Sequence, residues 1–564
     1  MCLMASSIVA QKGKLNVIPL SIVEPRQAIT NLKNDIRFLS SDSLEGRATG
    51  SKGEKLAAEY IIGQWKKVGI GTDKMHSDYK QPFTFTQKKA PNAKCEFKMI
   101  AGSATEAFRL GKDYWPLSYS SNSIGFSKAI FMNYGIAAPE LYHNDYDKKL
   151  NLDGKVFVMK VGKPDGINPH SHFNKYDISY RIDEAIKHGA SAVVFVSDDS
   201  QVEIPDSSIS LKIQSRSIPV IFCNNAKLGQ GHFPKDAVMF VKTEIDKTET
   251  TGNNLMAFID NGAENTVVIG AHYDHLGYGE VSGSLHKHGE KAIHNGADDN
   301  ASGIAAMLEL SRRLKASTIP QKYNYMFCAF SGEEWGLYGS SSLMKNLPMH
   351  TSRINYMINM DMVGRLDTAK KTLLIYGTGS SPSWRVIDDI AATSFTIKKS
   401  ESGVGPSDHT SFYKENIPVL HFFTGQHSDY HKPSDDEKYI NYPGLVSIVD
   451  YIFELTQKMN DKEKIAFTKT KDSDNESAPR FKVSLGIMPD YVYEGEGVKA
   501  DGVTDGKPAA KAGLLKGDII TQLGSTKTLD MMAYSKALAN YAKGDKAEVI
   551  YMRNGKEMKV VVEF

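Results

Sequence analysis

Four short, continuous apolar runs stand out in the middle of the chain. They cover residues 266–271, 325–330, 354–360 and 419–423. Elsewhere apolar residues recur at spacings of three and four, as in residues 302–314 and 441–459. Short apolar runs are typical of buried strands, and the longer spacing is typical of helices that bury one face. Their alternation predicts an α/β sheet.

Residue types that bind metals follow these runs or lie between them. They are His272, Asp299, Glu333, Glu334, Asp361 and His431. Sites in α/β sheets form outside the carboxyl ends of the strands, so we expect the loops that carry these residues to converge on one crevice. Zinc binds His nitrogen and carboxylate oxygen, and two zinc ions about 3.5–4 Å apart can share a carboxylate. Each residue alone is readily explained as an ordinary polar residue at a strand end, but the ordered set predicts a metal centre.

The motifs around these residues resemble those of metallopeptidase family 28, the di-zinc aminopeptidases of clan MH. The motifs are A-H-Y-D at 271–274, G-A-D-D-N-A-S-G at 296–303, E-E at 333–334, N-M-D-M at 359–362 and Y-H-K-P-S-D at 430–435. The resemblance implies two zinc ions per chain. It assigns His272 and Asp361 to one ion, Glu334 and His431 to the other, and Asp299 as the bridge. It also implies a cis peptide between Asp299 and Asn300.

The resemblance implies roles for two further carboxylates. Glu333 would be the general base for a hydroxide that bridges the zinc ions, and would later deliver the proton to the leaving amine. Asp274 would orient His272 by accepting a hydrogen bond from its other ring N–H. We therefore expect Glu333→Gln to keep zinc and to lose nearly all turnover.

Other polar residues in this region have less specific patterns. The triplet S-D-H at 407–409 lies near the substrate pocket in the family, which makes Asp408 and His409 candidate substrate-binding residues. His427 competes with His431 as a ligand, and the Y-H-x-P-x-D pattern selects His431. Four further histidines lie between the first two motifs without regular ligand spacing, so a polar rim is favoured over a third metal site. They are His275, His286, His288 and His294.

Two further modules are expected in the chain. Residues 96–245 interrupt the peptidase pattern and resemble a protease-associated (PA) domain. Residues 461–480 are polar and are interpreted as a linker. Residues 481–564 resemble a PDZ domain, a fold that binds an extended C-terminal peptide as an added strand. Its carboxylate-binding loop would be formed by Ser484, Leu485, Gly486 and Ile487.

The expected architecture is an α/β protein with three modules. A phosphorylase/hydrolase-like mixed-sheet catalytic domain occupies residues 25–95 and 246–460, the PA insert is β-rich, and the PDZ domain is small and α+β. Residues 1–24 form an N-terminal segment. Residues 1–11 resemble the end of a secretory signal peptide, with Cys2 as a candidate lipid anchor. This predicts a secreted or periplasmic protein.

Composition narrows the range of partners. Among 564 residues there are 68 basic and 66 acidic side chains, and the net charge of +2 gives no footprint for nucleic acid. No apolar run reaches the roughly 18 residues that a transmembrane span needs. The four cysteines have neither metal nor redox spacing. The expected partners are peptide substrates, and a C-terminal peptide at the PDZ groove.

The sequence thus predicts a metal-dependent exopeptidase, with an aminopeptidase that releases N-terminal residues as the first choice. One alternative is a glutaminyl-cyclase-like acyltransferase on the same fold, which uses one zinc ion. The other is a non-enzymatic peptide-binding protein. The zinc content per chain distinguishes the cyclase from the aminopeptidase. The complete set of metal ligands, with the general base, argues against a non-enzymatic protein. No motif names an oxyanion-stabilising residue.

Overall fold

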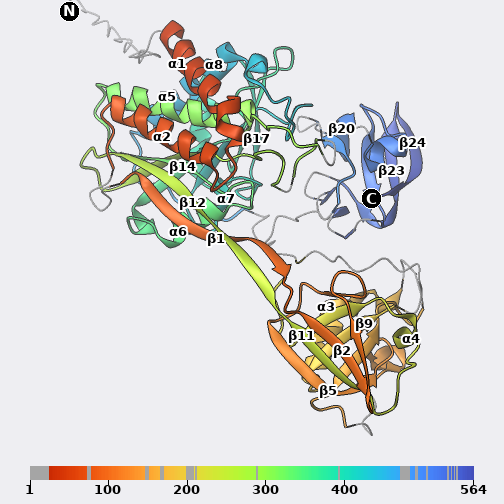
Figure 1. Ribbon diagram of the computed structural model, residues 1–564. Coiled ribbons are helices and arrows are strands. Elements are labelled where there is room, and N and C mark those ends of the chain that lie inside the picture. The colour runs from red at the N-terminus through yellow and green to blue at the C-terminus, as the bar shows by residue number, and fades with distance from the viewer. Residues whose placement is uncertain are drawn as a thin grey trace, which may run out of the picture. The chain divides into compact units, whose positions relative to one another are not determined.

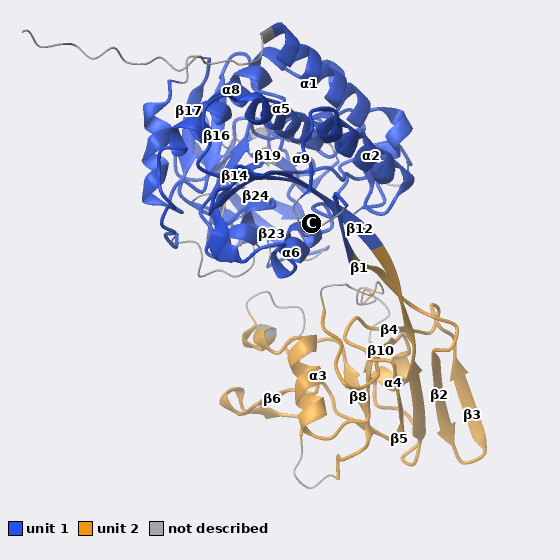
Figure 2. Cartoon of the chain, turned by 90° about the vertical axis from the view of Figure 1, so that its left-hand side faces the viewer, with its two compact units in different colours: residues 1–83, 251–564 blue, residues 84–250 orange. Residues whose placement is uncertain are grey.

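The computed structural model describes residues 25–72, 78–146, 151–165, 171–197, 209, 213–281, 283–286, 290–391, 394–470, 483–489, 493, 495–503, 506–529, 533–534, 537–538, 540–541 and 544–564. The expected signal segment, with Cys2, lies outside the described residues, as does His288. The chain divides into two compact units, Met1–Phe83 with Thr251–Phe564, and Thr84–Thr250 (Figure 2). It passes between them within two long strands, β1 (Lys80–Pro91) and β12 (Ile245–Ile259).

An eight-stranded sheet forms the centre of the first unit, in the order β1-β12-β14-β13-β15-β18-β16-β17. The four predicted apolar runs are its middle strands: β14 (Asn324–Phe330), β13 (Thr266–His272), β15 (Ile354–Met360) and β18 (Val419–Phe423). These four are parallel, whereas β12 and β16 (Thr372–Tyr376) run antiparallel to their neighbours β14 and β18. The last strand, β17 (Thr396–Ser400), is parallel to β16. The predicted mixed-sheet α/β fold is confirmed, and four carboxyl ends lie at one edge.

Helices cover both faces of this sheet (Figure 1). Val267 and Ile269 of β13 belong to the core that contains α1 (Pro25–Leu39), α2 (Lys52–Lys67), α5 (Gly303–Ala316) and α8 (Tyr442–Met459). The residue between them, Val268, belongs to a second core with α6 (Tyr338–Lys345) and α7 (His409–Tyr413). Because successive side chains of a strand point to opposite faces, burial on both faces produces a continuous apolar run.

The first part of the expected linker is packed against this unit. Ile465 is 6% exposed, and its N–H donates to Oδ1 of Asn355 at 2.8 Å. The N–H of Thr470 donates to the hydroxyl of Tyr413 at 2.6 Å. The interpretation of residues 461–480 as a linker therefore does not hold for its first part, because Ile465 is buried there and the backbone of this part donates to side chains of the first unit. Residues 471–480 lie outside the described part of the chain.

The second unit is built on another eight-stranded sheet, in the order β3-β2-β11-β5-β8-β9-β10-β4. Its helices are α3 (Ile178–Lys187) and α4 (Ala226–Gly229). The apolar spacing of Ile182, Ala185 and Ile186 predicts a helix over residues 180–188. Helix α3 instead begins at Ile178, because the Asp177 side chain caps it by accepting a hydrogen bond from the Tyr180 N–H. The strands of this sheet are β2 (Glu96–Ala101), β3 (Ala104–Phe108), β4 (Tyr114–Pro116), β5 (Ser123–Phe131), β8 (Val156–Lys160), β9 (Ala192–Val196), β10 (Val220–Cys223) and β11 (Val238–Thr243).

The C-terminal residues form a separate, antiparallel sheet. Its strands are β19 (Ile487–Pro489), β20 (Val498–Val503), β21 (Ile519–Leu523), β22 (Thr526–Lys527), β23 (Lys546–Arg553) and β24 (Lys556–Glu563). Leu485 is buried in the core of this sheet, and Gly486 has a φ of +80°, a conformation that favours glycine. The PDZ resemblance implies a helix beside the peptide groove at residues 534–541, which lie partly outside the described residues. No helix in the described ranges is both long and apolar enough to cross a membrane.

Candidate metal centre

The carboxyl edge of the first sheet brings the predicted ligands together from separate segments. His272 is the last residue of β13, and Asp361 directly follows β15. Glu333 and Glu334 follow β14 after a turn at Gly332, whose φ is +68°. Asp299 lies in an irregular helical turn, η4 (Ala297–Ser302), and the peptide that links it to Asn300 is cis, as the resemblance implied.

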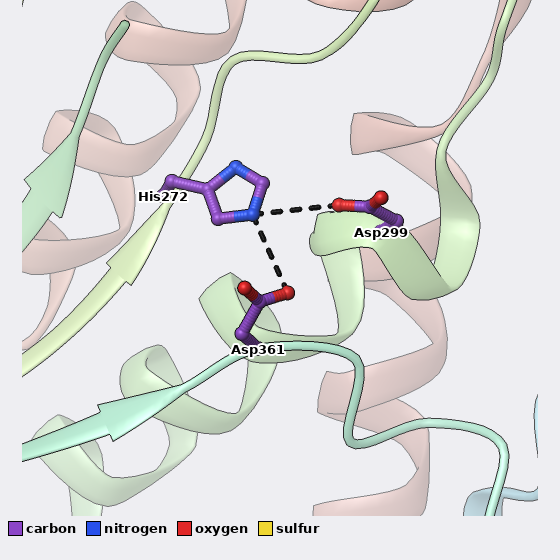
Figure 3. Close-up of side chains that lie close together, drawn as sticks. All are labelled: His272, Asp299 and Asp361. Carbon is purple, nitrogen blue, oxygen red and sulfur yellow. Dashed lines mark ion pairs between the residues drawn. The ribbon is translucent and has the colours of Figure 1, made fainter. Parts of the chain in front are cut away.

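The first group of side chains is His272, Asp299 and Asp361 (Figure 3). Nε2 of His272 lies 3.4 Å from Oδ1 of Asp299 and 3.4 Å from Oδ1 of Asp361. The other ring nitrogen, Nδ1, lies 3.1 Å from the backbone carbonyl oxygen of Asp274. The ring is therefore fixed with Nε2 facing the two carboxylates.

Asp274 orients His272 through its main chain and not, as expected, through its carboxylate. The nearest carboxylate oxygen lies 3.9 Å from Nδ1. That carboxylate instead accepts hydrogen bonds from the Thr49 hydroxyl at 2.9 Å and from the backbone N–H of Glu333 at 3.2 Å. Asp274 thus also fixes the backbone of Glu333.

The second group surrounds the other oxygen of Asp299. Nε2 of His431 lies 3.2 Å from Oδ2 of Asp299 and 3.3 Å from Oε2 of Glu334. Its Nδ1 lies 3.0 Å from the carbonyl oxygen of Gly283, which orients this ring from a different loop. Asp299 therefore lies between His272 and His431, with one carboxylate oxygen toward each.

His275 lies inside this second group rather than in a rim around it. The residue is fully buried, and its Nδ1 is 2.7 Å from Oε1 of Glu334. Within the described structure its Nε2 has no hydrogen-bond partner. The polar-rim interpretation is therefore wrong for His275. Its position directly after Asp274, in the run H-Y-D-H, is the signal that would have separated it from the other histidines.

The distances distinguish ligand contacts from hydrogen bonds. Zinc–ligand bonds of about 2.0–2.2 Å place neighbouring atoms of a tetrahedral site about 3.3–3.6 Å apart. The contacts of His272 and His431, at 3.2–3.4 Å, are close to this range. The His275–Glu334 distance of 2.7 Å is that of a hydrogen bond. The residues present thus fit two metal ions that share Asp299, and His431 fits the second one better than His275.

Charge separates the carboxyl groups of the cluster into two kinds. Burial by itself would raise the pKa of Asp299 and of Glu334. The surrounding histidines outweigh it, holding the pKa of Asp299 well below its usual value and that of Glu334 at about 2. Burial raises the pKa of Glu333 well above its usual value, and the neighbouring acids Glu334 and Asp361 add to this. Neighbouring carboxyl groups with opposite shifts are typical of a site that divides binding from proton transfer.

Residues 254–456 match the model of peptidase family M28, and residues 465–564 match that of the PDZ domain. Residues 254–456 belong to peptidase family M28. A probable leucine aminopeptidase of Arthroderma otae is 27% identical over 176 residues, which cover 29% of this chain and 45% of that protein. The chain thus spans a little under half the length of this relative. Aminopeptidase YwaD of Bacillus subtilis is 28% identical over 345 residues, covering 58% of this chain and 68% of that protein.

Among solved structures, BSAP, a zinc aminopeptidase from Bacillus subtilis, matches with a TM-score of 0.43 at 21% identity. The match covers 79% of this chain and 97% of that chain.

The two expected substrate residues of the M28 domain have different surroundings. Asp408 is fully buried, burial raises its pKa to about 7, and it shares the electrostatic environment of His272 and Asp361. His409 stacks on His421, with ring centroids 4.4 Å apart. Burial holds the pKa of both histidines low, so both rings are neutral. Asp408 thus belongs electrostatically to the cluster, whereas His409 packs within the protein.

Other histidines of the M28 domain have partners of their own. His427 does not compete for Asp299, because its Nε2 lies 3.2 Å from Oδ2 of Asp298. His294 lies 2.8 Å from the hydroxyl of Ser284, and His286 lies 3.5 Å from Glu290.

Sequence reasoning missed Tyr430 in the M28 domain. Its ring stacks on His431, with centroids 3.8 Å apart. Burial, together with the charges of Asp299 and Glu334, raises its pKa well above the usual value, so the phenol keeps its proton. Its place directly before His431 was the available signal. A protonated hydroxyl in this position is a candidate donor to an oxyanion.

Proposed function

We propose that this chain is a zinc-dependent aminopeptidase that releases N-terminal residues from peptides. The observation that carries the proposal is the pair of His–carboxylate groups on either side of Asp299, with separations suited to two metal ions. The family of residues 254–456 and the aminopeptidase names of the relatives support it.

In this proposal His272 and Asp361 would hold one zinc ion, Glu334 and His431 would hold the other, and Asp299 would serve both. When bound, the ions would supply Lewis acidity and an activated water at neutral pH. The Glu333 carboxylate takes the proton of the attacking water and returns it to the leaving amine. Asp274 holds the Glu333 backbone in place, and the Tyr430 hydroxyl donates to the oxyanion that develops on the scissile carbonyl.

The other modules are part of the same proposal. The protease-associated insert expected at residues 96–245 is part of the proposal, and the compact second unit, Thr84–Thr250, supports an insert in this part of the chain. The PDZ region takes an extended C-terminal peptide, with the carboxylate in the loop that contains Leu485 and Gly486. The apolar character of residues 1–11 supports a secreted or periplasmic location.

Zinc content and substrate preference, measured on one sample, test the function. We expect two zinc ions per chain by elemental analysis, and hydrolysis of aminoacyl chromogenic substrates but not of their N-acetylated forms. One zinc ion with cyclisation of an N-terminal Gln would favour the cyclase alternative. Cleavage that is indifferent to N-acetylation would overturn the aminopeptidase proposal.

A pair of histidine variants tests the ligand assignment. His431→Ala should reduce the zinc content from two ions to one, because it removes a ligand that only one ion uses. His275→Ala should keep both ions, because His275 makes a hydrogen bond to Glu334 instead of a metal contact. Loss of one ion in His275→Ala, with both retained in His431→Ala, would exchange the two assignments.

A further inference from the structure

Arg47 is a buried cation whose side-chain partners among the described residues are main-chain carbonyl groups. It is 1% exposed and ends the short helical turn η1 (Asp42–Arg47). Its guanidinium donates to the carbonyl oxygens of Tyr273 at 2.9 Å, Asn295 at 2.8 Å and Gly296 at 3.1 Å, and also to that of Leu39. No carboxylate of the described residues forms an ion pair with it. A planar guanidinium presents five N–H donors on three nitrogens and can bond to carbonyls at separate positions, whereas an ammonium has three donors on a single nitrogen.

Three of the four carbonyls bound by Arg47, those of Tyr273, Asn295 and Gly296, belong to the two segments that carry His272 and Asp299. Tyr273 directly follows His272, and Gly296 directly precedes the η4 turn that contains Asp299. The backbone of η1 adds two bonds in the other direction: the His275 N–H donates to the Arg47 carbonyl at 3.2 Å, and the Gly277 N–H donates to that of Gly46 at 2.9 Å. The η1 turn is therefore bonded to both loops.

The charge of Arg47 opposes that of the acidic cluster. Burial lowers the pKa of Arg47 to about 10, while the charges of Asp299, Asp274, Asp435 and Glu334 act to raise it. The guanidinium therefore stays cationic at neutral pH. A fixed positive charge beside these carboxylates reduces their mutual repulsion when no metal is bound.

We infer that Arg47 is a positioning residue of the metal centre. It holds the His272 loop and the Asp299 loop at the spacing that a metal ion needs, and so determines zinc affinity rather than substrate recognition. The inference rests on the zinc centre of the proposed function but not on the peptidase activity. Outer contacts of this kind typically change metal affinity by about 10- to 100-fold.

The second unit contains a matched arginine away from any ligand loop. Arg181 is 3% exposed, and burial lowers its pKa to about 10 as well. Its guanidinium donates to the carbonyls of Lys160 and Val161 at 2.9 Å, and to those of Tyr134 and Gly162 at 3.2 Å. Arg181 thus has the same chemistry in a place where no zinc ligand depends on it.

Three variants of the full chain test the inference: Arg47→Lys, Arg47→Met and Arg181→Lys. Zinc affinity is measured on metal-free protein by competition with a chromophoric chelator, and kcat and KM are measured with zinc in excess. We expect Arg47→Lys to weaken zinc binding by about 10- to 100-fold. KM should be unchanged, and activity should recover as zinc is added. Arg47→Met should bind zinc more weakly still, because Met has no N–H donor and leaves the loop carbonyls without any side-chain bond. Arg181→Lys should bind zinc within about twofold of wild type.

Two results would overturn the inference. One is wild-type zinc affinity in Arg47→Lys, with only a lower melting temperature of the metal-free protein, which is the signature of a merely structural residue. The other is an equal loss of affinity in Arg181→Lys, which indicates general destabilisation. Arg47→Lys decides the question if Arg47→Met does not fold, because it keeps the charge and most of the volume. A wild-type protein that binds two zinc ions and cleaves no free-amine peptide would contradict the proposed function alone.

Discussion

The two eight-stranded sheets of this chain both have parallel central strands, but different residues follow the carboxyl ends of those strands. In the first unit β14, β13, β15 and β18 are parallel, and in the second β5, β8, β9 and β10 are parallel. Strands β8, β9 and β10 are buried like the middle strands of the first unit, whereas β5 also carries exposed residues. The strands of the first unit lead into His272, Asp361 and the Glu333–Glu334 pair, whereas β8 leads into Val161 and β10 into Asn224. The metal-type groupings found among the described residues all lie in the first unit.

Each unit also places a buried arginine at a carboxyl end of its parallel strands. Arg47 bonds to the carbonyl that follows β13, and Arg181 bonds to carbonyls at and after the end of β8. The carboxylates that act most strongly on the charge of Arg47 are the proposed ligand Asp299 and its neighbour Asp274. At Arg181 the corresponding carboxylate is Asp177, which is not a proposed ligand. Both units therefore share one backbone arrangement, in which a buried arginine bonds to carbonyls at the carboxyl ends of parallel strands. We call this arrangement the frame. A few side chains placed on that frame make the metal centre.

The largest expected effect is the loss of turnover in Glu333→Gln, with a carboxylate of the second unit as its control. Glu333→Gln should lower kcat by roughly 10²–10⁴-fold, because the amide cannot accept the proton of the attacking water. It should retain zinc, because Glu333 is not a proposed ligand. Glu184→Gln in the second unit, which removes a carboxylate paired with Lys187 and His188, should leave kcat within about twofold of wild type. Steady-state kinetics with elemental analysis check both. Wild-type turnover in Glu333→Gln would remove it from the mechanism.

Metal removal should also separate the two units. A ligand present at about 1,000 times its dissociation constant stabilises the folded state by about 4 kcal/mol, and zinc would act only on the unit that binds it. Stripping zinc with a chelator should therefore weaken hydrogen-exchange protection in β13 and β15. Protection in β9 and β10 should be unchanged. Equal loss of protection in both sheets would mean that the two units unfold as one.

The same Phe→Ala substitution in each core compares how the two units support zinc binding. Phe327 in β14 and Phe195 in β9 are both fully buried on parallel strands. Replacing either with Ala should cost about 3–5 kcal/mol of stability in its own unit. Phe327→Ala should also weaken zinc binding, because β14 leads to Glu333 and Glu334. Thermal melts and chelator competition measure the two quantities. Weaker zinc binding in Phe195→Ala would show that the insert supports the metal centre.

Much of the catalytic fold can be predicted from the sequence, for a physical reason. Both faces of the central sheet are covered by helices, so its strands appear as continuous apolar runs, and residues 354–360 coincide with β15. The ligand candidates can be predicted because each follows such a run within a recognisable motif. Helix starts are harder, as α3 shows, because a capping side chain rather than periodicity sets the first residue.

Contacts between distant loops could not be predicted in this way. The hydrogen bond of His275 to Glu334 and the choice of the Asp274 carbonyl over its carboxylate depend on how each loop turns after its strand. The bonds of Arg47 join segments on either side of β12 in the sequence. Hydrophobic spacing predicts which face of a helix or strand is buried, but it does not predict which distant loops contact each other.

The smallest expected effect lies in two matched helix caps. The Ser51 hydroxyl accepts the Glu54 N–H at 3.1 Å at the start of α2, and Oδ1 of Asp177 accepts the Tyr180 N–H at 2.8 Å at the start of α3. Ser51→Ala and Asp177→Ala should each cost about 1 kcal/mol, since a lost cap leaves one N–H without its acceptor. Urea unfolding measures the cost, and neither variant should change zinc affinity by more than about twofold. Glu54 also bonds to the hydroxyls of Ser331 and Tyr273, close to the ligand loops. Weaker zinc binding in Ser51→Ala alone would therefore mean that α2 supports the metal centre through Glu54. The first unit would then depend on a helix contact that the second unit does not share.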